Sequence, residues 1–155
     1  MTENELIKIS LSKAMALCSR REYSTDDIRS RLNLWGVSDN NSEKIINILY
    51  KENFINDIRY SKAFVKDKFI YNKWGKVKIA AHLRIKKIPP DIIKTALDSI
   101  DNEDYIKILK ELLSDHRRHI KARSKYDLKG KLLRYGLSKG FESDLLYDLL
   151  NDTET

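Results

Sequence analysis

The segment STDDIRSRLNLWGV at residues 24–37 decides the fold, because it returns twice further along the chain. GKVKIAAHLRIKKI follows at residues 75–88 and SKYDLKGKLLRYGL at residues 124–137, so the three segments start 51 and 49 residues apart. A period of about fifty residues is typical of stacked supersecondary units. We therefore expect a tandem array of similar units and not one irregular domain.

Each segment predicts a helix with a capped start. Ser24, Gly75 and Ser124 occupy the N-cap position, where both residue types are accepted. In the first and third copies an aspartate follows three residues later, as in a capping box, and apolar residues four positions apart line one helical face. In the second copy, Trp74 precedes the cap and is expected to pack on Ile79 as a hydrophobic staple.

The predicted ends of these helices differ between the copies. Gly36 and Gly136 are expected to end their helices, because glycine readily adopts the left-handed conformation found there. The second copy has Lys87 at this place. The apolar residue that follows, Leu137 in the third copy, is expected to lie just past the helix end.

A helix is expected before and after each middle helix. The preceding helices are predicted at about residues 10–20, 57–72 and 103–122. The following helices are predicted to start at Ser42, at Pro89-Pro90-Asp91 and near Phe141. We expect residues 1–8 and 151–155 to be frayed ends.

The predicted fold class is therefore all-α, with three tandem tri-helical repeats that resemble helix-turn-helix units and form an elongated, curved body. The expected units are residues 1–56, 57–102 and 103–155.

Positive charge is concentrated in two parts of the chain. The net charge is +7, but residues 1–58 hold 8 Lys and Arg against 9 Asp and Glu. Residues 59–94 hold 11 against 2, and residues 116–139 hold 9 against 1. A localised positive field favours a nucleic acid or another polyanion as the partner.

The basic residues also form stripes on the predicted helices. On the helix before the second segment, the stripe consists of Arg59, Lys62, Lys66 and Lys73. On the helix before the third segment and just beyond it, the stripe contains Lys107, Lys110, Arg117, Arg118, Lys121 and Lys125. Lys86 and Lys87 end the second segment, and Lys131 lies on the third. Solvated helix faces are the plainer interpretation, although exposed helices usually mix charges of both signs.

The start of the second middle helix differs most from the other two. Lysines replace the acidic residues there, at Lys73, Lys76 and Lys78. The free amides at a helix start and the helix dipole attract anions, so this turn is a candidate phosphate contact. Trp74 is a candidate for stacking on a base, although the hydrophobic staple onto Ile79 is the favoured explanation.

No catalytic constellation is found in the sequence. It has no glycine-rich phosphate loop and no paired cysteines, so we expect neither an enzyme nor a cofactor. His116 and His119 have a spacing that can chelate a metal, but His116 lies within an apolar stripe and is expected to pack in the core. The single Cys18 and the lack of a long apolar run predict a soluble cytoplasmic protein, expected to be a monomer.

Two short motifs resemble those of a known family. Arg20-Arg21-Glu22-Tyr23-Ser24 and Asn56-Asp57-x-Arg59-Tyr60, in this order and spacing, are similar to the RecX family. The similarity extends over about residues 14–150, and the third copy matches mainly through its helix pattern. Lys87 departs from the glycine that is common in the family before the apolar residue.

The resemblance implies a regulator of the RecA recombinase that has no chemistry of its own. Proteins of this kind are thought to lie in the groove of the RecA–single-stranded-DNA filament. They block filament extension, ATP hydrolysis, strand exchange and the SOS co-protease activity. The implied partners are the RecA filament and single-stranded DNA, and binding to duplex DNA stays open.

Two other classes of function also remain open. Tri-helical units with basic faces occur in DNA-binding transcriptional regulators, which would prefer particular DNA sequences. A helical scaffold that binds only proteins would instead show weak, salt-insensitive behaviour towards DNA.

Overall fold

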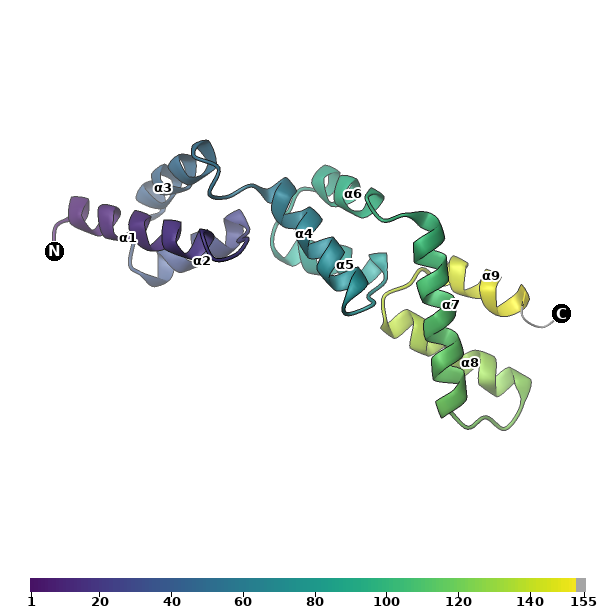
Figure 1. Ribbon diagram of the computed structural model, residues 1–155. Helices are drawn as coiled ribbons and strands as arrows, with labels where there is room; N and C mark the ends of the chain where they lie inside the picture. Colours follow the sequence, from purple (N-terminus) through teal and green to yellow (C-terminus); the bar gives the residue numbers. More distant parts are fainter. Residues whose placement is uncertain (153–155) are drawn as a thin grey trace.

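The computed structural model describes residues 1–152, and within them it contains nine helices and no strand. The helices are α1 (Glu3–Cys18), α2 (Thr25–Leu34), α3 (Asp39–Lys51), α4 (Asp57–Ile70), α5 (Lys76–Ile85), α6 (Pro90–Asp98), α7 (Asn102–His119), α8 (Lys125–Ser138) and α9 (Ser143–Asp152). Figure 1 shows them in three successive groups along an elongated, bent body with the termini at opposite ends. The predicted fold class is confirmed.

We refer to α1–α3, α4–α6 and α7–α9 as triplets 1, 2 and 3. Whether boundaries near residues 56 and 102 separate domains stays a prediction. Within the part of the chain that the structure describes, no helix is both long and apolar enough to cross a membrane.

The helix starts correct two of the predictions. The segment 1–8 is not frayed, because α1 begins at Glu3 and the Thr2 hydroxyl accepts a hydrogen bond from the Glu5 amide at 3.2 Å. The helix expected from Ser42 begins earlier, at Asp39, because the Ser38 hydroxyl caps it. At the other end of the chain, residues 151 and 152 belong to α9, and residues 153–155 lie outside the described part.

The middle helices α2, α5 and α8 start where the sequence predicts. Ser24 and Asp27 form a complete capping box, and the Ser124 hydroxyl accepts from the Asp127 amide at 3.1 Å. Gly75 caps α5 without a side-chain hydrogen bond. Local sequence thus fixes all three starts.

The ends of α2 and α5 share one turn, although their residues differ. Gly36 has φ +85° and Lys87 has φ +59°, so lysine adopts the left-handed conformation that glycine supplies in the first copy. The amides of Val37 and Ile88 then donate to the carbonyls five residues earlier, at 3.0 and 3.2 Å.

The predicted end of α8 at Gly136 is wrong. This helix continues for another turn to Ser138, and Gly140 takes the left-handed conformation with φ +94°. Gly136 instead lies where α9 crosses α8, because a Cβ there would come within 2.3 Å of a Leu146 methyl group. Leu137 is therefore inside the helix and 44% exposed, and Phe141 is the buried residue after the turn.

The buried residues form two separate cores. One lies in triplet 1 and contains Ile28, Leu32 and Ile45 among its fully buried members. The other joins triplets 2 and 3, and it includes Leu83 from α5 and Leu109 from α7. Triplets 2 and 3 are thus packed as one hydrophobic body, whereas triplet 1 has a core of its own.

Candidate nucleic-acid interface

The middle helices meet head to tail at two joints along the body. In joint A the end of α5 faces the start of α2, and in joint B the end of α8 faces the start of α5. Both joints use the same places in the repeat, but their chemistry differs. This difference decides which basic residues have partners within the chain.

Joint A is held by ion pairs between side chains. The Lys86 ammonium contacts the Asp27 carboxylate, and the Lys87 ammonium lies 3.6 Å from the Asp26 carboxylate. Both lysines were predicted to bind nucleic acid from the sequence. The structure gives them acidic partners in triplet 1, and their contact with nucleic acid stays a prediction.

The two family motifs complete joint A. The Arg59 guanidinium donates to the Glu22 carboxylate at 2.9 Å and to the Asn53 carbonyl at 3.0 Å. The Asp57 carboxylate accepts from the Thr25 amide at 2.9 Å, which satisfies a free donor at the start of α2. Arg59 and Asp57 thus hold two triplets together, and a direct contact of Arg59 with DNA is untested.

The aromatic residues of these motifs lie beside the same joint. Tyr23 is buried, and the Arg21 guanidinium lies 4.2 Å from its ring centre. Burial, together with the nearby Asp27 carboxylate, raises the pKa of Tyr60 to about 12. Arg20 is exposed.

Joint B is held by the backbone. The Gly75 amide donates to the Lys139 carbonyl at 2.7 Å, and the Val77 amide donates to the Gly140 carbonyl at 2.9 Å. The Lys76 amide donates to the Tyr105 hydroxyl at 2.9 Å. Because the turn after α8 occupies the start of α5, the prediction that these amides face an anion is wrong.

Removing the ion pairs of joint A should loosen triplet 1. For a Lys86→Gln/Lys87→Gln variant we expect a small loss of stability, about 0.2–1 kcal/mol per pair. We also expect a broader distribution of distances between triplets 1 and 2. Double electron–electron resonance between spin labels at positions 44 and 91 measures that distribution. The labelled variants carry Cys18→Ser, so that only the introduced cysteines are labelled.

A second label pair provides the control for this prediction. Labels at Asp91 and Asp148 report on triplets 2 and 3, which share one core, so their distance distribution should stay unchanged. Raising the salt concentration should broaden only the distance distribution of the first label pair, because salt screens the exposed ion pairs of joint A. Equal broadening of the two distance distributions would contradict the prediction that the ion pairs of joint A hold triplet 1 in place.

A cluster of lysines surrounds Trp74 next to joint B. The ammonium groups of Lys78 and Lys68 lie 4.5 and 5.1 Å from the centre of the indole ring. Burial and the neighbouring charges of Lys78 and Lys73 lower the pKa of Lys139 below its usual value. We call Trp74, Lys68, Lys73, Lys78 and Lys139 the Trp74 cluster.

The Trp74 ring also has neighbours in the protein. Its centre lies 4.6 Å from that of His82 and 6.5 Å from that of Phe64. The indole therefore packs partly against α4 and α5 and is only partly buried. Stacking of Trp74 on a base stays a prediction.

Sequence reasoning missed Lys68 and Lys139. Once the extra turn of α8 is allowed for, Lys139 occupies the place that Lys86 has in the second copy. A shift of the third segment by one helical turn would have found it. The clue to Lys68 is its position, because it lies on α4 six residues before Trp74.

The predicted stripe on α4 lines a groove between α4 and α7. Lys62, Lys66 and Lys73 lie there with Lys107. The same groove also contains Asp101, Asp104 and Glu111. The charge of this groove is therefore mixed, whereas in the Trp74 cluster Lys68 is the member for which the described residues show an ion pair, with Asp67 at 3.8 Å.

The basic residues of the third copy are spread over several surfaces. Arg118 pairs with Asp115, and the Lys131 ammonium lies 3.4 Å from the Asp127 carboxylate. Arg117 lines a hollow between α7 and α9, whereas Lys121 lies beside Lys131. Lys125 is exposed at the start of α8. These residues do not form one stripe.

The two histidines have other contacts. The His116 ring is half-buried and stacks on Tyr135, with ring centres 3.7 Å apart. His119 lies with Nδ1 2.7 Å from the Asp115 carbonyl oxygen. Within residues 1–152, no group of three or more His, Cys, Asp or Glu side chains is placed to hold a metal ion.

Comparison with known proteins finds relatives along nearly the whole chain. Residues 56–97 match the family profile described as RecX, second three-helix domain. The regulatory protein RecX of Clostridium acetobutylicum is 30% identical over 145 residues, which cover 91% of this chain and 67% of the relative. The regulatory protein RecX of Clostridium beijerinckii is 29% identical over 147 residues, which cover 94% of this chain and 68% of the relative.

Two crystal structures share the fold. One of a regulatory protein RecX superposes with a TM-score of 0.87 at 22% identity, over 97% of this chain and 73% of the other. RecX from Lactobacillus salivarius superposes with a TM-score of 0.84 at 19% identity, over 97% and 98%. From the sequence identity and coverage of the clostridial relatives, together with the shared fold, the chain belongs to the RecX family of regulatory proteins.

Proposed function

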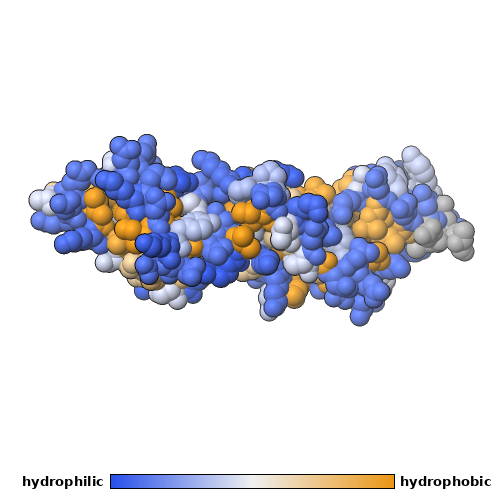
Figure 2. Space-filling model, turned by 90° about the horizontal axis from the view of Figure 1, so that it is seen from above, coloured by the Kyte–Doolittle hydropathy of each residue, from blue (hydrophilic) through white to orange (hydrophobic). Residues whose placement is uncertain are grey.

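We propose that the chain is a non-enzymatic regulator that binds the RecA–single-stranded-DNA filament and inhibits RecA. Its relatives carry the name regulatory protein RecX, and the resemblance noted from the motifs implies RecA as the partner. The elongated body suits a partner with an extended groove (Figure 1). In the view of Figure 2, hydrophilic residues cover most of the surface and hydrophobic residues form separate small patches.

One geometric observation carries this proposal furthest: the ammonium groups of Lys78 and Lys68 lie 4.5 and 5.1 Å from the centre of the Trp74 ring, and the charges of Lys73 and Lys78 act on Lys139 beside them. Lysines held near one another in a partly buried place repel, and an anion bound there would relieve the repulsion. Joint A has no such excess, since its lysines face Asp26 and Asp27. The Trp74 cluster is therefore our proposed contact with DNA phosphates.

The assay for this function is RecA ATP hydrolysis on single-stranded DNA, titrated with the chain. Inhibition far below one molecule per RecA monomer would support binding at filament ends. Inhibition only near equal amounts would support coating of the groove. If the ATP hydrolysis rate does not change at any ratio, the proposed function is wrong.

A Lys78→Gln/Lys139→Gln variant should weaken both inhibition and binding to single-stranded DNA. Each lost phosphate contact should reduce the slope of log affinity against log salt by about 0.7. The affinity should fall by the same factor for all DNA sequences. Fluorescence anisotropy with a labelled oligothymidylate at several salt concentrations measures this slope.

The matched control is Lys8→Gln/Lys44→Gln, which removes the same charge from exposed positions of triplet 1. We expect this control to keep nearly the wild-type slope. Circular dichroism would verify that both variants fold. Equal slopes for the cluster variant and the wild type would rule out the Trp74 cluster as the DNA contact.

A further inference from the structure

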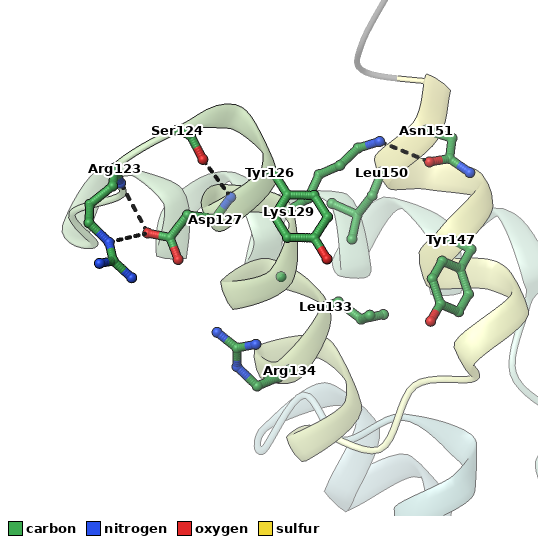
Figure 3. Close-up of a pocket in the computed structure, with 11 residues that line it drawn as sticks. Arg123, Ser124, Tyr126, Asp127, Lys129, Leu133, Arg134, Tyr147, Leu150 and Asn151 are labelled. Carbon is green, nitrogen blue, oxygen red and sulfur yellow. Dashed lines mark hydrogen bonds and ion pairs between the residues drawn. The ribbon is translucent and has the colours of Figure 1, made fainter.

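A pocket of about 580 Å³ opens between α8 and α9 in triplet 3 (Figure 3). Two tyrosines line it from different helices, Tyr126 in the first turn of α8 and Tyr147 on α9. Their exposed fractions are 88% and 53%, so neither ring is used to fill the core. Leu133 and Leu150 add apolar surface to the same pocket. Aromatic rings exposed on two sides of one pocket can stack on a flat ligand.

Positive side chains surround these aromatic rings. Among the described residues that line the pocket, Arg123, Lys129 and Arg134 are positive and Asp127 is the one carboxylate, and the Lys129 ammonium donates to the Asn151 side chain at 3.0 Å. This carboxylate accepts a hydrogen bond from the Arg123 amide at 3.0 Å, and it lies 4.0 Å from the Arg123 guanidinium and 3.4 Å from the Lys131 ammonium. Among residues 1–152, no ion pair is found for Arg134. The Arg134 guanidinium is therefore the positive group of the pocket that is available to an anionic ligand.

Gly130 supports the view that the open space is used. It lies inside α8 and lines the pocket, where glycine costs about 0.5–1 kcal/mol relative to alanine. Packing does not require it, because a Cβ at this position would meet nothing closer than the Arg134 guanidinium at 3.4 Å, an ordinary contact. Gly136 and Gly140, in contrast, both face atoms within 2.3 Å of such a Cβ. The missing side chain at Gly130 leaves room in the pocket and serves no packing need.

We propose that this pocket binds one nucleotide of a single-stranded nucleic acid. The base stacks on Tyr126 and Tyr147, and the Arg134 guanidinium contacts a flanking phosphate. Bases in a duplex are already stacked and paired, so the pocket selects single strands. The inference rests on the proposed function for its ligand, single-stranded DNA, and extends that function to a second site on triplet 3.

The first test compares Tyr126→Ala/Tyr147→Ala with Tyr126→Phe/Tyr147→Phe. Stacking on an aromatic side chain is worth about 1–3 kcal/mol per base, so the alanine variant should lose about tenfold in affinity for an oligothymidylate. The phenylalanine variant keeps the rings and should bind nearly as the wild type does. Fluorescence anisotropy with the full chain measures all three affinities.

A strand without bases separates base stacking from other causes. The wild type should bind an abasic oligonucleotide of equal length and charge about tenfold more weakly than oligothymidylate. The alanine variant should bind the two strands equally. Two results would overturn the inference. In the first, the alanine variant binds oligothymidylate as tightly as the wild type does. In the second, the alanine substitutions weaken binding to the abasic strand as much as they weaken binding to oligothymidylate.

A second variant fills the pocket and leaves both tyrosines in place. Gly130→Leu places a side chain in the pocket and replaces glycine by a better helix former, so stability should not fall while affinity for oligothymidylate drops. Unchanged affinity in a folded Gly130→Leu variant would also overturn the inference.

The RecA assay distinguishes this inference from the proposed function. If the tyrosine-to-alanine variant keeps its affinity for naked DNA but no longer inhibits RecA, the pocket binds protein and the inference is wrong, while the proposed function stands. If the wild type stacks bases as described but never inhibits RecA, the inference holds and the proposed function is wrong.

Discussion

A Leu109→Ala variant is expected to destabilise triplets 2 and 3 together and to leave triplet 1 unaffected. Leu109 on α7 is fully buried in the core that these two triplets share. Truncation of a buried leucine costs about 2–5 kcal/mol, because the side chain loses its contacts and a cavity remains. A loss of this size is a large part of the total stability of a small domain, about 5–15 kcal/mol.

The two tryptophans report on the two cores separately. Trp35 packs against the core of triplet 1, and Trp74 packs against the shared core. In urea unfolding followed by fluorescence, with Trp35→Phe and Trp74→Phe backgrounds, Leu109→Ala should lower only the midpoint reported by Trp74. Leu32→Ala, in the core of triplet 1, should lower only the midpoint reported by Trp35.

One cooperative transition would give a different result. If each truncation shifted both tryptophan signals by the same amount, the two cores would unfold as a single unit. The division of the molecule into triplet 1 and a fused body of triplets 2 and 3 would then be wrong.

A Gly75→Ala variant is expected to break joint B and lower the melting temperature. The new Cβ would lie 2.3 Å from the Gly140 carbonyl oxygen, a backbone atom that cannot rotate away. Such overpacking costs about 1–3 kcal/mol, or about 2–4 °C in melting temperature for each kcal/mol in a chain of this size. The backbone hydrogen bonds from Gly75 and Val77 across the joint would lengthen as the triplets separate.

Gly130→Ala, the same substitution inside α8, is the matched control for the melting temperature of Gly75→Ala. It adds the same methyl group to a helix interior where the contact is ordinary, so its melting temperature should rise slightly. Differential scanning calorimetry compares the two variants directly. A Gly75→Ala variant as stable as the wild type would show that α5 and α8 do not meet in solution as they do in this structure.

Local sequence determined the helices and their order. The Ser24 capping box, the proline pair at the start of α6 and the spacing of apolar residues act over one or two helical turns, and the structure has helices at all of these places. The fifty-residue period then sufficed to predict an array of triplets. These features depend on neighbours in the chain, so the sequence alone contains them.

The end of α8 shows where the local pattern misleads. Gly136 aligns with Gly36, but it lies inside α8 against Leu146 of the next helix, and α8 ends one turn later, before Gly140. Nothing within the segment distinguishes a glycine that ends a helix from one that admits a neighbouring helix.

The partners of the basic residues were decided only by the tertiary structure. Helical spacing places Arg59 on a stripe with Lys62 and Lys66, but its guanidinium finds Glu22, 37 residues earlier in the chain. Lys86 pairs with Asp27 across 59 residues, whereas Lys139 is brought next to Lys78 and Lys73. A charge pattern along one helix records which side chains share a face. Which charges are neutralised depends on the packing of distant helices, and the sequence pattern does not contain that packing.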